Sequence, residues 1–141
     1  MLVAVVSSAL VQAVRASLPP LSLRVGAVVD ALLLCGGRIG TGKQVALRLG
    51  LRNRFALARL LRDEGLPPLH ELAAWTSVLT WLDRAEDTGC SLCHIAFRAR
   101  KDPATCYRMV RRMTGMGWAE LRDRGAPWAV KRFAKECGAN Q

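Results

Sequence analysis

Two parts of this chain carry the same pattern of apolar and basic residues, about fifty residues apart. Val45-Ala46 recurs as Ile95-Ala96, and the hexapeptide Leu57 to Arg62 recurs in degenerate form as Cys106 to Arg111. The register slips by one residue between these two matches. Apolar residues in each copy follow the three- and four-residue spacing of an amphipathic helix. The repeat therefore predicts two copies of one small helical unit.

Glycine residues and capping side chains mark the helix ends around the first copy. Ser22 can cap a helix whose apolar stripe continues as far as Gly36-Gly37. Thr41 can cap a short helix that ends at Gly50, a residue free to take positive φ. A longer helix is expected from about Asn53 to Glu64. A short helix, a tight turn and a longer helix together make a helix-turn-helix unit.

The second copy follows the longest periodic segment of the chain, from about Leu69 to Ala85, which we expect to be a connecting helix. Ser91 or Cys90 is then placed to cap a short helix. Pro103 stands at a favoured first helical position, before a helix that continues to about Thr114. The second copy is thus a second helix-turn-helix unit.

These boundaries predict an all-α fold in which a long helix joins two helix-turn-helix units. Ala and Leu supply much of the apolar content of 51%, which favours helix over sheet. We divide the chain into an N-terminal apolar segment that packs on the core as a helix (1–21), the first helix-turn-helix unit (22–66), the linker helix (67–89), the second, divergent unit (90–126) and a basic C-terminal tail that caps the core as an amphipathic helix (127–141).

The charge of the chain gathers in the two units. Lys and Arg total 21 against 11 Asp and Glu, a formal net charge of +10, which is typical of a protein that binds nucleic acid. Residues 41–66 and 91–126 are both strongly basic, whereas residues 67–90 between them are net acidic. We interpret this pattern as two DNA-facing parts joined by a scaffold.

A helix that reads the major groove needs hydrogen-bonding side chains on its exposed N-terminal half. Arg52, Asn53 and Arg54 stand at that place in the first unit, where arginine can pair with guanine and asparagine with adenine. Cations farther along the helix more often contact phosphates. The predicted DNA-binding residues are Lys43, Arg52, Asn53, Arg54, Arg59 and Arg62 in the first unit, and Arg100, Lys101, Ala104, Thr105, Arg108 and Arg111 in the second.

Several short motifs carry a family resemblance. They are Val45-Ala46-x-x-Leu49-Gly50-Leu51 with Arg59 in the first unit, and Ile95-Ala96, Arg108, Thr114-Gly115 and Ala119-Glu120-Leu121-Arg122 in the second. On these motifs the stretch from about Ser22 to Arg122 resembles the DNA-binding domain of AraC-type (AraC/XylS) transcription regulators. The resemblance implies seven helices, sequence-specific binding of adjacent major grooves of double-stranded DNA, transcriptional control with RNA polymerase as a candidate partner, and a bacterial cytoplasmic setting.

The second unit departs from the family pattern at two places. Its turn reads Ala99-Arg100-Lys101 where the family usually has Gly-Phe, and Trp118 replaces a proline after the closing glycine. We therefore expect the first unit to read bases and the second to keep mainly the scaffold and the charge.

Two other motifs offer alternatives to DNA binding. Gly37 to Lys43 matches the phosphate-binding pattern G-x-x-x-x-G-K after an apolar run that could be a strand, but Gln44 stands where magnesium needs Ser or Thr. Cys90-Ser91-Leu92-Cys93-His94 matches the haem-attachment motif C-x-x-C-H. Cys90, Cys93 and His94, with Cys106, could also bind zinc in a redox or metal protein. We give more weight to structural roles for these residues, and expect no cofactor and no metal.

The remaining classes are less favoured. Catalytic spacing of carboxylates, or of Ser with His and Asp, is not recognisable, so we do not expect an enzyme. The apolar start lacks a positive region for export, an odd number of cysteines fits a reducing cytosol, and no stretch is long enough for a membrane span. The chain is too short for a separate small-molecule effector domain. A basic helical adaptor remains a further alternative.

Overall fold

The computed structural model describes residues 6–138, and this part of the chain is all helical, as the sequence predicts. Nine helices and no strands occur within these residues. The helices are α1 (Ser8–Ser17), α2 (Leu23–Leu34), α3 (Gly42–Arg48), α4 (Arg54–Asp63), α5 (Leu69–Thr88), α6 (Leu92–Arg98), α7 (Pro103–Thr114), α8 (Trp118–Arg124) and α9 (Ala126–Gly138). None of the described helices is long and apolar enough to cross a membrane.

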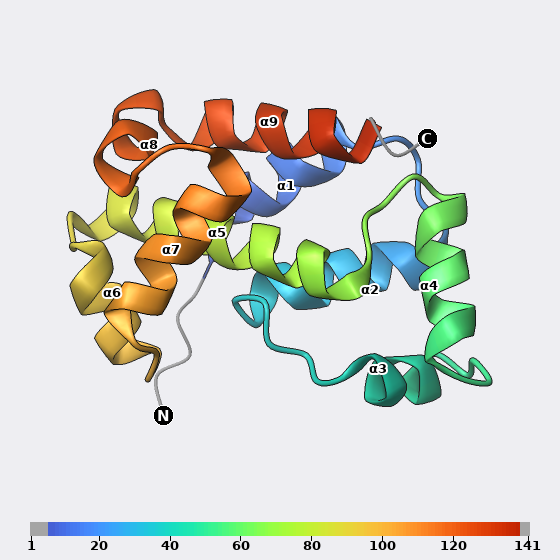
Figure 1. Ribbon diagram of the computed structural model, residues 1–141. Helices are drawn as coiled ribbons and strands as arrows, with labels where there is room; N and C mark the ends of the chain where they lie inside the picture. The colour runs from blue at the N-terminus through green and yellow to red at the C-terminus, as the bar shows by residue number, and fades with distance from the viewer. Residues whose placement is uncertain (1–5, 139–141) are drawn as a thin grey trace.

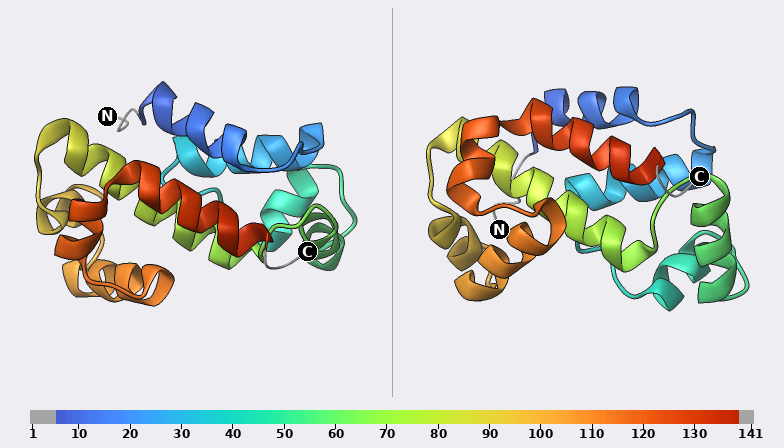
Figure 2. Two further views of the ribbon diagram at one scale, coloured as in Figure 1. Left: turned by 90° about the horizontal axis from the view of Figure 1, so that it is seen from above. Right: turned by 45° about the horizontal axis from the view of Figure 1, so that its top comes forward.

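The long helix α5 lies at the centre of the molecule and contacts α2, α6, α7 and α9 (Figure 1). The pair α3 and α4 packs together at one end, and the pair α6 and α7 packs together at the other. Helices α1 and α9 lie side by side and form a further layer, as both views in Figure 2 show. The two repeated units are therefore held apart by a shared core.

Helix α5 is much more than a connection. Leu72, Trp75, Leu79 and Leu82 have the helical spacing of one apolar face and are buried, and Thr76 and Ser77 are buried as well. Their hydroxyl groups donate to backbone carbonyls one turn earlier, at 3.0 Å and 2.8 Å, so these polar atoms keep hydrogen bonds in the interior. Neighbouring elements cover α5 around most of its circumference, and the predicted linker is the main core helix.

Helices α1 and α9 confirm the helices expected at the two ends of the chain. Ser7 caps α1 and also donates from its amide and its hydroxyl to Asp83 of α5, at 3.1 Å and 2.6 Å. Phe133 of α9 is fully buried, with its ring centroid 5.7 Å from that of Trp75. The outermost parts of the two predicted end segments, 1–5 and 139–141, lie outside the described residues.

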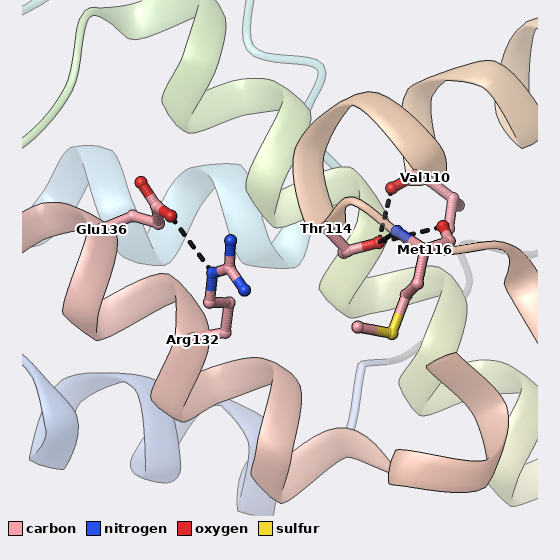
Figure 3. Close-up of polar contacts among 5 residues, drawn as sticks. All are labelled: Val110, Thr114, Met116, Arg132 and Glu136. Carbon is pink, nitrogen blue, oxygen red and sulfur yellow. Dashed lines mark hydrogen bonds and ion pairs between the residues drawn. The ribbon is translucent and has the colours of Figure 1, made fainter. Parts of the chain in front are cut away.

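The end of α7 is fixed by one side chain. The Thr114 hydroxyl lies 2.7 Å from the Val110 carbonyl oxygen and accepts from the Met116 amide at 3.3 Å (Figure 3). It thereby satisfies polar groups that a helix terminus leaves unpaired.

Arg132 and Glu136 make an ion pair of 3.1 Å, one turn apart on α9.

Candidate nucleic-acid interface

The turn after the short helix has the same backbone hydrogen bonds in both repeated units. The Leu51 amide donates to the Ala46 carbonyl at 2.9 Å, and the Lys101 amide donates to the Ala96 carbonyl at 2.9 Å. Each bond joins residues five apart at the end of the short helix, and the residue just before each donor has a left-handed backbone conformation. The sequence repeat is therefore also a repeat of backbone conformation.

Gly50 and Arg100 occupy the left-handed position in these two turns. Their φ angles are 73° and 56°, and Arg100 is the only non-glycine residue with positive φ in the described part of the chain. A side chain in this conformation strains the backbone, whereas glycine does not. The second unit thus holds an exposed arginine where the first has the sterically preferred residue.

The helices that follow are capped in the same way, by Asn53 for α4 and Asp102 for α7. Asn53 Oδ1 accepts from the Ala56 amide at 2.9 Å, and Asp102 Oδ2 accepts from the Thr105 amide at 3.3 Å. Thr41 and Ser91 cap the two preceding helices, so the caps are fifty residues apart before the turn and forty-nine after it. The second unit therefore has a turn that is one residue shorter than that of the first, and this accounts for the one-residue slip in the repeat.

Helices α4 and α7 present equivalent inner and outer faces. Leu57 and Leu61 are buried in α4, and Cys106 and Val110 are buried at the matching positions of α7. The matching exposed positions carry arginine in both helices. These pairs are Arg59 with Arg108, and Arg62 with Arg111. Each helix therefore points a basic stripe away from the core.

The structure places eleven of the twelve predicted DNA-binding residues on the surface and Lys101 in a partly buried position. The ammonium group of Lys101 lies 5.4 Å from the centroid of the Trp81 ring. Burial lowers the pKa of Lys101, and the positive charge of Arg38 lowers it further. Lys101 therefore lies between the two units, apart from the exposed basic stripe of α7.

Several predicted residues are engaged in local contacts. The Thr105 hydroxyl donates to Asp102 at 3.1 Å, and Arg108 donates to that hydroxyl at 3.2 Å. This chain of contacts orients Arg108 and places a carboxylate at the start of α7. Asn53 uses its side-chain oxygen for the cap, which constrains the adenine pairing that the sequence suggested. The Arg54 guanidinium carbon lies 5.0 Å from the centroid of the Phe55 ring.

Ion pairing distinguishes the helix pairs α3 with α4 and α6 with α7 from the rest of the described structure. The described residues contain three salt bridges, and their cations are Arg15 of α1, Arg124 of α8 and Arg132 of α9. Among the described residues, no cation of α3 to α4 or of α6 to α7 has a carboxylate within salt-bridge distance. The basic stripes are therefore free to take negative charge from a partner.

Sequence reasoning missed two exposed aromatic residues on these helices. Phe55 is 63% exposed on α4 and Tyr107 is 42% exposed on α7. It also missed Arg112, which lines a groove between the units together with Arg54 and Lys101. Apolar side chains on a recognition helix can contact the methyl group of thymine. The repeat contained a signal for Phe55. It aligns Phe55 with Ala104, which was already predicted to face DNA.

The two competing motifs have other structural roles. The apolar run before Gly37 belongs to α2 and not to a strand, and Thr41 forms a capping box with Gln44. Cys93 and His94 are exposed in the first turn of α6, while Cys106 is buried. Within residues 6–138, no group of three His, Cys, Asp or Glu side chains is arranged to hold a metal ion. The zinc hypothesis therefore has no ligand cluster in the described structure.

Comparison of the chain with protein-family models, curated proteins and solved structures finds no match. The functional interpretation thus rests on the geometry and charge of the two units.

Proposed function

We propose that this protein binds double-stranded DNA through two helix-turn-helix units, α3 with α4 and α6 with α7, as AraC/XylS-type transcription regulators do. Helices α4 and α7 are the proposed recognition helices and enter successive major grooves on one face of the duplex. Transcriptional control in the cytoplasm belongs to the same proposal.

The observation that carries this proposal is the pair of equivalent basic stripes without salt bridges. Arg59 and Arg62 recur as Arg108 and Arg111 on helices whose buried faces also match. The ion pairs of the described structure all involve cations outside the helix pairs α3 with α4 and α6 with α7. Phosphate groups of a duplex would supply the missing negative charge, and contacts of this kind account for much of the affinity of DNA-binding proteins.

The two units differ in what they bring to the DNA. The first has a neutral cap, Asn53, and an exposed aromatic residue, Phe55, at the start of its recognition helix. The second has the carboxylate of Asp102 at the same place, which repels phosphate, and an arginine held in a strained conformation in its turn. We infer that the first unit reads bases and that the second mainly contacts the backbone.

The first experiment selects a preferred site from random duplexes and measures affinity against ionic strength. We expect an enriched sequence whose Kd is at least about a thousandfold below that of non-specific DNA. Binding that stays sequence-independent would contradict the regulator function and leave a basic adaptor.

Matched variants then test the two stripes. Arg59→Gln and Arg108→Gln remove one cation each at equivalent positions, and each should reduce the slope of log K against log salt by about one. Lys135→Gln removes an exposed cation from α9 and serves as the charge-matched control. An equal effect of all three variants would show that net charge, and not the two stripes, drives binding.

A further inference from the structure

A basic cleft lies between the two units, bounded by the end of α2, the loop after it, α5 and α6. Its volume is about 500 Å³, within the range of small-ligand sites. The buried Trp81 forms part of its wall, together with apolar side chains of α2 and α6. The charged residues in its lining are Arg38, Arg84, Arg98, Lys101 and Asp83.

The negative charge in this cleft does not balance the positive charge. Asp83 is the only carboxylate in the lining, and its oxygens accept hydrogen bonds from Ser7. None of the four cations belongs to a salt bridge within the described residues. Arg38 instead donates to the Ala99 carbonyl at 2.9 Å, which joins the loop before α3 to the end of α6. Arg38 is thereby held at the cleft in a fixed place.

Lys101 shows the electrostatic consequence of this imbalance. Its pKa is lowered first by burial and then by the charge of Arg38, so its charged form is disfavoured in the cleft as it stands. An anion beside Lys101 would oppose both effects. Arginine and lysine side chains that line a concave site are common ligands of phosphate.

We infer that this cleft is a binding site for a phosphate group, with Lys101, Arg38 and Arg98 as its cationic ligands. The phosphate can belong to a small free molecule or to a DNA backbone. Arg38 lies in the loop of the first unit that leads to α3, and Arg98 and Lys101 belong to the second unit, so an occupant would bridge the two units. The inference does not depend on DNA binding, because the site is complete within this chain.

The test is a calorimetric titration of the whole chain, without DNA, with inorganic phosphate against chloride at equal ionic strength. We expect one phosphate per chain, and affinity at least about tenfold lower in Lys101→Met, since one charge-assisted contact is lost. Methionine keeps the length of the side chain beside Trp81. Lys135→Met on α9 is the control and should bind as the wild type does.

Arg98→Gln provides a second test of the phosphate site, because Arg98 is exposed and its replacement does not alter the core. It should also weaken phosphate binding, with an unchanged unfolding transition. If phosphate does not bind, or binds equally to wild type, Lys101→Met and Arg98→Gln, the inference is wrong, and the proposal of DNA binding is unaffected.

A second titration identifies the source of the phosphate group. If free phosphate competes with a duplex for wild-type protein but not for Lys101→Met, the site takes a backbone phosphate. If phosphate and duplex bind together, the site serves a small phosphorylated molecule. Either outcome requires that phosphate binds the cleft, and so supports the inference.

Discussion

Arg100 is the residue at which backbone strain and proposed function meet. It repeats the position of Gly50, with a φ of 56° where glycine has 73°, and its side chain is exposed. A left-handed conformation costs a non-glycine residue about 1–2 kcal/mol. Strain of this kind persists where the surrounding structure imposes it, and often marks a functional site.

Replacing Arg100 by glycine should therefore stabilise the fold and weaken the function. We expect Arg100→Gly to raise the free energy of unfolding by about 0.5–1 kcal/mol, after the entropy gained by the unfolded chain is deducted. Urea denaturation measures this change, and duplex binding at low salt should fall. A variant that is less stable, or that binds DNA as the wild type does, would contradict the assignment of Arg100.

Cys137 provides a pH-dependent prediction. Burial, with a contribution from Glu136, raises the pKa of its thiol to about 12 from an ordinary value of 9.0. Between these values the unfolded chain loses the proton and the folded chain keeps it, so the unfolded state binds fewer protons and stability falls as pH rises. Urea midpoints should therefore decrease from pH 9 upwards, and less steeply in Cys137→Ala than in the exposed control Cys35→Ala. Equal slopes would exclude this role for Cys137.

The helix caps could be predicted from the sequence, whereas the position of Lys101 could not. The caps Ser22, Thr41 and Ser91 were predictable, because each depends on a hydroxyl and a backbone amide a few residues away. The position of Lys101 was not predictable. Its environment depends on Trp81 and Arg38, which are distant in sequence and come together only in the fold.

At the scale of elements, the loop after α2 is locked to α5 by a close approach of two backbones. Gly37 has a φ of 89°, and a Cβ atom there would lie 2.6 Å from the Ala73 carbonyl oxygen and would also collide with the Ser77 hydroxyl. That hydroxyl lies 3.1 Å from the Gly36 carbonyl oxygen, to which it can donate. The close approach positions the loop that carries Arg38.

This contact predicts a large difference between two glycine substitutions. Gly37→Ala should lower the free energy of unfolding by about 3 kcal/mol or more, because backbone strain and a steric collision with backbone combine. Gly50→Ala meets no atom within 4 Å and should cost only the strain, about 1–2 kcal/mol. Chemical denaturation of both variants measures the difference. Similar losses for the two would show that the loop yields easily.

The all-helical prediction is confirmed, but the role expected of the longest helix was incomplete. The spacing of Leu72, Trp75, Leu79 and Leu82 indicates one buried face for α5. Thr76 and Ser77 look like solvent-facing residues in the sequence, yet both are buried because their hydroxyls bond to the helix's own carbonyls. A polar side chain that makes its hydrogen bond within its own helix can be buried, and a prediction from hydropathy alone does not detect this.

At the scale of the whole molecule, the shared core fixes the distance between the two proposed recognition helices. Buried residues of α4 and α7 belong to the same hydrophobic core as α5, and this shared core holds the two units at one separation. Once a preferred duplex is selected, insertion of 5 base pairs between its half-sites should lower affinity about a hundredfold, because one half-site turns to the opposite face. Insertion of 10 base pairs restores the face but not the distance. Unchanged affinity after either insertion would mean that only one unit binds.

The packing of α1 against α9 has a consequence for the order in which the protein is made. Leu10, Val14 and Leu18 are buried at or near this layer, and they leave the ribosome before any other part of the described core. Their partner, α9, is the last of the described helices to emerge, so during synthesis this apolar face stays uncovered while both repeated units are already complete in sequence. Synthesis that stops before Ala126 leaves it without its cover, as a surface that chaperones and proteases recognise. The nascent chain therefore gains this outer layer only after helices α2 to α8 have been synthesised.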